Sequence, residues 1–87
     1  MKKFPLLSEN QVTVIIADGG NGHVLNVNLE LYKNYTQDEI YWLFDNKDLA
    51  KEFIQNQSIL NDKLEFIIYD KNQSILEYIE AVHWKNR

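Results

Sequence analysis

Residues 40–70 constrain the fold more than any other stretch, because their hydrophobic pattern changes from period 2 to a helical period and back. Apolar side chains first alternate along the chain, which predicts a β-strand: Ile40, Trp42 and Phe44. Asp45 and Asn46 follow, and their short polar side chains are typical of residues that cap a helix start. We therefore expect a strand that ends at Phe44 and a helix that begins near Lys47.

The expected helix spans residues 47–57 and is amphipathic. Its apolar stripe consists of Leu49, Ala50, Phe53 and Ile54, and its other side carries Lys47, Asp48, Lys51, Glu52 and Gln55. Residues 56–62 are rich in side chains that compete with helical hydrogen bonds, and alternation then resumes at Leu64, Phe66 and Ile68. Two strands joined by one helix in the same sheet normally run parallel, with a right-handed crossover. We therefore expect this helix to cover one face of a sheet.

The chain before this unit predicts a β-hairpin. β-Branched residues dominate residues 11–17, and Val12, Val14 and Ile16 share one face. All three glycines lie in residues 18–23, where a tight reversal of the chain requires positive φ angles. Residues 24–32 then alternate strictly, which predicts a second strand with one face in the core: Leu25, Val27, Leu29 and Leu31.

Two stretches allow more than one interpretation. Residues 36–39, TQDE, match a capping box, so a short helix is the alternative to the strand at 40–44. Residues 70–73, DKNQ, are turn formers that predict a hairpin into a last strand at 74–82. The facing of that strand stays open, because each side carries apolar residues and one carboxylate, Glu77 on one side and Glu80 on the other.

These elements predict an α+β fold in a single domain over residues 1–87. A mainly antiparallel sheet of about five strands carries one helix on one face, in the order β-β-β-α-β-β. A chain of 87 residues suits one domain.

The charge distribution indicates the kind of partner. The chain has 13 acidic and 9 basic residues, and residues 30–80 hold eleven Asp or Glu against five Lys. Because affinity for nucleic acid depends on Lys and Arg that neutralise phosphates, this excess disfavours direct binding of nucleic acid and favours a basic protein partner. The alternative is that the acidic excess only maintains solubility.

The sequence lacks the patterns of export, membrane insertion and thiol chemistry. No cysteine is present, which excludes disulfides and thiolate metal sites. The apolar run in the first eleven residues is too short for a signal peptide, and no 18 consecutive residues are apolar. We therefore expect a cytoplasmic protein that does not interact with membranes.

No catalytic, cofactor-binding or metal-binding pattern is present. The two histidines, His23 and His83, do not form a pair by their spacing. Asp45 and Asp48 lie where carboxylates stabilise a helix start, so they require no catalytic role. We expect a protein that is not an enzyme and holds no cofactor and no metal ion.

The sheet face that the helix leaves uncovered is the candidate partner-binding surface. We expect Asn26, Asn28, Glu30 and Tyr32 to lie beside Glu65, Ile67 and Tyr69 on this face. Tyrosine combines a large contact area with a hydroxyl group, and carboxylates steer a basic partner. The expected contact residues are Glu30, Tyr32, Glu65 and Tyr69, with Asp48 and Glu52 on the helix as a second surface.

The segments YWLFDNKDLAKEFI and FIIYDKNQSILEYI, within about residues 40–80, resemble small immunity proteins of bacterial polymorphic and contact-dependent toxin systems in their order of elements. The resemblance carries no individual residue over. It implies an acidic cytoplasmic protein that neutralises a cognate toxin, often a basic nuclease. Phage-encoded inhibitors such as anti-CRISPR proteins are similar in the same way, and a small homo-oligomeric module, or weak homodimer, is a further alternative.

Overall fold

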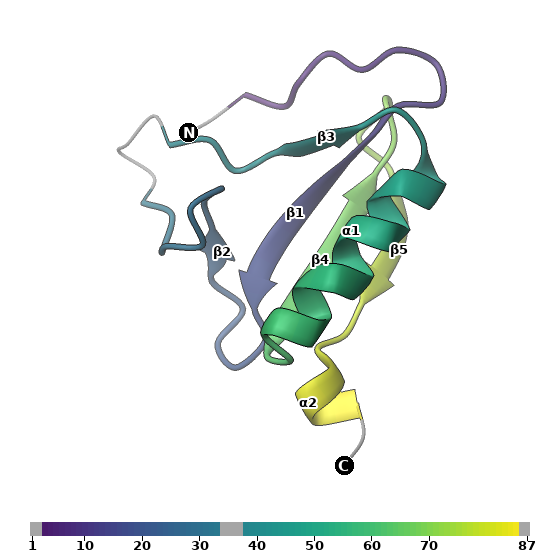
Figure 1. Cartoon of the computed structure of the whole chain (residues 1–87). Helices are drawn as coiled ribbons and strands as arrows, with labels where there is room; N and C mark the ends of the chain where they lie inside the picture. Colours follow the sequence, from purple (N-terminus) through teal and green to yellow (C-terminus); the bar gives the residue numbers. More distant parts are fainter. Residues whose placement is uncertain (1–2, 34–37, 86–87) are drawn as a thin grey trace.

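The computed structural model describes residues 3–33 and 38–85. Its elements, in chain order, are β1 (Val12–Asp18), β2 (Val24–Leu25), β3 (Trp42–Phe44), α1 (Lys47–Leu60), β4 (Leu64–Tyr69), β5 (Ile75–Ile79) and α2 (Val82–Lys85). The α+β fold expected from the sequence is confirmed: a five-stranded antiparallel sheet carries one main helix against one face (Figure 1).

β1 is the strand to which most of the sheet is attached. β4 pairs with it antiparallel over Thr13–Asp18 along one edge. The other edge is therefore shared by β2, which pairs at Ile16 and Ala17, and by β3, which pairs at Val12–Val14. β3 and β4 are both antiparallel to β1, so they run parallel to each other as expected, with β1 between them. β5 pairs with the free side of β4 and forms the outer edge of the sheet.

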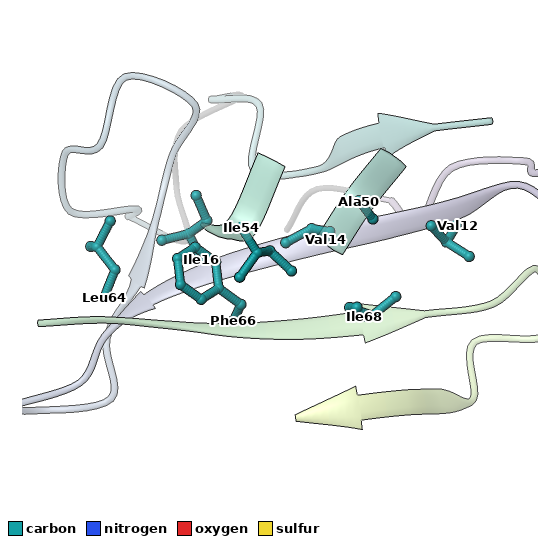
Figure 2. Packing of buried hydrophobic residues seen from close by; sticks show 8 residues of the cluster. All are labelled: Val12, Val14, Ile16, Ala50, Ile54, Leu64, Phe66 and Ile68. Atoms are coloured by element: carbon teal, nitrogen blue, oxygen red, sulfur yellow. The ribbon is translucent and has the colours of Figure 1, made fainter. Parts of the chain in front are cut away.

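The core lies between α1 and the sheet. Alternate residues of β1 and β4 point toward the helix and are buried, together with Ala50 and Ile54 of α1 (Figure 2). The strand part of this cluster is Val12, Val14, Ile16, Leu64, Phe66 and Ile68, in agreement with the alternation in the sequence. Phe53 is half-buried beside them, whereas Leu49, expected in the same stripe, is 45% exposed.

The capping and turn residues act as the sequence predicts, but α1 is longer than expected. The Asn46 side chain accepts a hydrogen bond from Leu49 N at 2.9 Å and starts the helix. α1 then continues to Leu60 instead of ending near 57, and Asn61 N donates to Gln57 O at its end. At the other turn, Asp70 Oδ1 accepts from the backbone N–H groups of residues 72 and 74.

The prediction of a long second strand over residues 24–32 is wrong. β2 ends at Leu25, and the chain then folds back so that Leu31 bridges to Leu25. Asn26 causes the reversal: its buried side chain accepts hydrogen bonds from Asn28 N at 2.9 Å and Glu30 N at 3.1 Å. These bonds compete with strand pairing, as Asn side chains do in turns. Leu29 consequently adopts a positive φ of 62° and is not in the core.

The two ambiguous stretches now have an assignment. Residues 42–44 form a strand, and Trp42 and Phe44 face α1 as the alternation predicts; residues 36 and 37 of the alternative capping box lie outside the described residues. The last strand ends at Ile79 and not at 82, because Val82–Lys85 forms α2. In β5, Glu77 lies opposite buried Ile68 and Tyr78 opposite Ile67, so Glu77 faces α1 and Tyr78 faces away.

Candidate functional site

The sheet face turned away from α1, called the far face below, is formed by the residues that alternate with the core. Cross-strand pairs share a face. The pairs of the far face are Thr13 with Tyr69, Ile15 with Ile67, Ala17 with Glu65, and Ile67 with Tyr78. No described helix packs on this face in the way that α1 packs on the other.

The N-terminal segment covers one end of the far face. The ring of Phe4 makes edge-on contacts with Tyr41, at a centroid distance of 5.4 Å, and with Tyr69, at 5.9 Å. Thr13, opposite Tyr69, is fully buried, and its hydroxyl donates to Trp42 O at 3.1 Å. The far face is therefore not uncovered along its whole length, as the sequence led us to expect, and Tyr69 is part of a packed aromatic cluster.

The tyrosines of this cluster influence one another. Burial is the largest cause that raises the pKa of Tyr41, and the nearby Tyr32, Tyr69 and Glu39 raise it further. Tyr32 and Tyr69, both expected to contact a partner, are thus brought together around Tyr41, a residue that the sequence did not single out. Tyr32 also lines a hollow with Ile15 and Tyr41, which extends to Val24 of β2.

The other end of the far face, over β4 and β5, is open and acidic. Glu80 follows the last residue of β5, and it and Glu65 both lie close enough to Tyr78 to act on its hydroxyl. The Tyr78 hydroxyl donates to Glu65 Oε2, and this hydrogen bond, together with burial and the charges of Glu65 and Glu80, raises the pKa of Tyr78 to about 12. We call Glu65, Tyr78 and Glu80, together with Ile75 at the Tyr69 end of β5, the β4–β5 surface.

The β4–β5 surface combines exposed apolar area with unneutralised charge. Ile75 is 60% exposed and Tyr78 54% exposed. Among residues 3–33 and 38–85, no salt bridge joins Glu65 or Glu80 to a lysine, an arginine or a histidine. The site therefore keeps two carboxylates near Tyr78 that can accept a cation from a partner.

Glu77, on the opposite face of β5, is a carboxylate whose charge is neutralised within the chain. Lys51 Nζ lies 2.9 Å and Lys47 Nζ 3.3 Å from its oxygens. The hydrogen bond from Lys51 is the largest cause that lowers the pKa of Glu77. The carboxylate on the α1 side of β5 thus has two lysine partners, whereas no salt bridge in the described part of the chain reaches Glu65 or Glu80.

The remaining predicted contact residues lie elsewhere. Glu30 lies on the turn that Asn26 closes, beyond β2, so that β1 and β2 separate it from β4; the expected neighbourhood of Glu30 and Glu65 is wrong. Asn26, expected on the exposed face, is 5% exposed. Asp48 and Glu52 are exposed on α1, as expected for its polar side. Only Glu65 of the six predicted residues belongs to the β4–β5 surface.

Tyr78 and Glu80 were not among the predicted contact residues. The missing information was the facing of β5. Counting residues along both strands from the DKNQ turn does not predict which side chains of β5 face α1. The register of β4 and β5 shifts between Ile68 and Tyr69. Leu76, at this irregularity, lines a hollow with Val12 and Lys47 near the start of α1.

No group of three or more His, Cys, Asp or Glu side chains in residues 3–33 and 38–85 has the arrangement of a metal site. No helix in this part of the chain has the length and apolar character that crossing a bilayer requires.

Comparisons with protein-family models, with curated proteins and with solved structures find no match to this chain.

Proposed function

We propose that this protein is a non-catalytic cytoplasmic immunity protein, which binds a basic toxin domain, such as a nuclease, and thereby neutralises it. One observation supports this proposal most directly: Glu65 and Glu80 both lie near the exposed Tyr78, and no salt bridge among residues 3–33 and 38–85 reaches either carboxylate. An acidic patch that is left unpaired on a stable scaffold is suited to a basic partner.

Charge acts on a basic partner at long range and at short range. The net charge of −4 attracts a basic protein at long range and accelerates encounter. At short range, a lysine or arginine of the partner forms an ion pair with Glu65 or Glu80, and Tyr78 supplies an aromatic ring with a hydrogen-bonding hydroxyl beside them. Affinity and association rate then both depend on the β4–β5 surface.

The experiment uses the protein encoded by the neighbouring reading frame, because immunity and toxin genes normally lie side by side. The neighbouring protein, expressed alone, should arrest growth. Co-expression of the 87-residue chain should abolish this arrest. Reversal of both charges, Glu65→Lys with Glu80→Lys, should slow association of the purified proteins about tenfold at low salt, since charges at the rim of an interface steer encounter.

Glu30→Lys is the matched control, because it changes the net charge in the same direction on a turn beyond β2. A double reversal at Glu65 and Glu80 that affects association no more, per charge, than Glu30→Lys would contradict the assignment of the surface. The exposed α1 carboxylates Asp48 and Glu52 would then be tested in the same way. A neighbouring protein that is neither toxic nor bound would contradict the function itself.

A further inference from the structure

The outer edge of β5 is the feature that the proposed contact through Glu65 and Glu80 does not use. β5 pairs with β4 on one side only, and no described strand or loop pairs with its other side. A strand edge of this kind presents a row of backbone N–H and C=O groups that can accept a further strand. Ile75 and Tyr78 are more than half exposed along it.

A groove runs beside this edge on the α1 side. α1 packs over β1, β3 and β4, and β5 projects beyond it. The groove that results has a volume of about 680 Å³ between the second half of α1 and the strand. Ile54 and Ile59 of α1, Ile79 of β5 and Val82 of α2 supply its apolar lining. Ile59 is 82% exposed, an unusual exposure for an isoleucine next to an apolar groove.

The two faces of the sheet at β5 thus favour different side chains on a strand that pairs with its edge. Successive residues of a strand point to opposite faces of the sheet. On the α1 side an added strand would meet the apolar part of the groove, around Ile59 and Ile79. On the far side it would meet Tyr78 and Glu80, which also reach the rim of the groove, and Glu65 lies on the next strand, β4. A strand that alternates apolar and basic residues satisfies both sides at once.

We propose that an extended segment of the basic partner adds to the edge of β5 as a further strand. Its apolar side chains fill the groove beside Ile59 and Ile79, and its lysine or arginine side chains lie against Glu80 and Glu65. This inference rests on the proposed function, because the charge of the added strand follows from the unneutralised pair of carboxylates.

A second copy of the chain fits this edge less well. It would bring a further Glu77 and Glu80 to a seam that already contains both carboxylates. Each Glu77 would keep its salt bridges to Lys47 and Lys51. Neither Glu80 has a salt bridge among the described residues. A basic strand contributes charge of the opposite sign at the same position. Charge complementarity therefore selects the basic segment as occupant.

The test uses a synthetic peptide as the probe, with blocked ends and the alternating sequence Lys-Val-Lys-Val-Lys-Val-Lys. Two control peptides have the same charge: one carries its four lysines and three valines in separate blocks, and one is the alternating peptide with every second backbone nitrogen methylated. The alternating peptide should slow hydrogen exchange of the outward-facing β5 amides about tenfold or more. The two controls should not.

Two neighbouring residues of α1 supply matched protein variants. Ile59 lines the groove, whereas Leu60, 79% exposed, does not, and both side chains are exposed enough for substitution without loss of folding. Ile59→Lys should weaken binding of the alternating peptide about tenfold, because a lysine then occupies the apolar groove. Leu60→Lys changes the net charge equally and should leave binding within about twofold.

The outcomes separate this inference from the proposed function. Equal binding of all three peptides, without protection of the β5 amides, overturns strand addition. Strand addition is also overturned if the neighbouring toxin binds through Glu65 and Glu80 but leaves the β5 amides unprotected. In that case the proposed function stands. β5 amides that are already protected in the free protein, with a sedimentation coefficient that rises with concentration, show a second copy on the edge and overturn the inference. Binding of the alternating peptide without any response to the neighbouring protein overturns the proposed function alone.

Discussion

The indole ring of Trp84 lies against Gly19, so that α2 closes over the turn between β1 and β2. A Cβ atom on Gly19 would come within 3.2 Å of Trp84 Cζ3, 2.9 Å of Ala81 Cβ and 2.8 Å of the backbone oxygen of Lys63. Gly19 N also donates to that oxygen at 2.8 Å. Trp84, near the end of the described residues, is therefore packed against the rest of the domain.

Gly19→Ala should therefore lower the free energy of unfolding by about 1–3 kcal/mol, because the backbone oxygen of Lys63 cannot move away from a new methyl group as a flexible side chain could. Gly22→Ala is the control: nothing lies within 4 Å of its Cβ position, and its positive φ of 76° costs about 1 kcal/mol. Urea unfolding measures both. Only Gly19→Ala should shift the tryptophan emission, and an unchanged spectrum would contradict the contact with Trp84.

Phe53 connects α1 to β3. Its ring lies 4.8 Å from that of Trp42 and 5.0 Å from that of Phe44, measured between centroids. Phe53→Ala should cost about 3 kcal/mol, the lower end of the range for aromatic truncations, because the ring is half-buried. Leu49→Ala, on the exposed side of the same helix, should cost less than about 1 kcal/mol. A cost below about 1 kcal/mol for Phe53→Ala would place that ring outside the core.

The core could be predicted from the sequence because it depends on local periodicity. β1 and β4 alternate without interruption, and Asn46 is a strong cap, so burial and hydrogen bonding agree with the pattern. The stretch from residue 24 to 32 has equally regular alternation, but Asn26 offers its backbone neighbours a side-chain acceptor that a strand would not provide. Alternation alone does not reveal this competition.

Asn26→Ala should destabilise the protein by about 1–3 kcal/mol, since it removes the acceptor of two backbone N–H groups in a part-buried turn. The Asn26 amide also donates to Asp38 Oδ2 at 3.3 Å, so one substitution removes three hydrogen bonds. Asn28→Ala changes an exposed side chain two residues away and should stay within about 0.5 kcal/mol. Thermal unfolding compares the two variants, and equal melting temperatures would show that Asn26 does not hold the turn.

The candidate site was less predictable than the core for a physical reason. Its residues come from the facing of β5, and one irregularity beside Tyr69 decides which side chains reach the far face. The N-terminal cover of Tyr69 depends on the contact of Phe4 with two tyrosines far along the chain. Neither a single shift of register nor a long-range aromatic contact leaves a periodic signal in one sequence.

Glu77 should make stability depend on acid pH. Its pKa in the folded protein is lowered below 4.5 by the hydrogen bond from Lys51 and by Lys47, so its contribution is fully present above pH 4.5 and is lost as pH falls through the lowered value. Glu77→Gln should reduce stability at pH 7 by less than about 1 kcal/mol, because the ion pairs are partly exposed. The difference from the unmodified protein should shrink below pH 4.5. A difference that is constant down to pH 2, or that Glu52→Gln reproduces, would contradict this role.

Tyr78 should report the state of the β4–β5 surface through its own titration. The hydrogen bond to Glu65 stabilises the neutral phenol, which raises the Tyr78 pKa from 10.0 to about 12. Because the folded value is the higher one, the stabilisation is fully present below pH 10 and is lost as pH rises toward 12. Carbon-13 NMR of labelled tyrosine measures this pKa, and Tyr78→Phe assigns the signal. The pKa of Tyr78 should fall toward 10.0 in Glu65→Gln. It should fall less in Glu80→Gln, because the Glu80 carboxylate acts on Tyr78 only through its charge. A Tyr78 that already titrates near 10 in the unmodified protein would show that Glu65 is not engaged with it and is fully available to solvent.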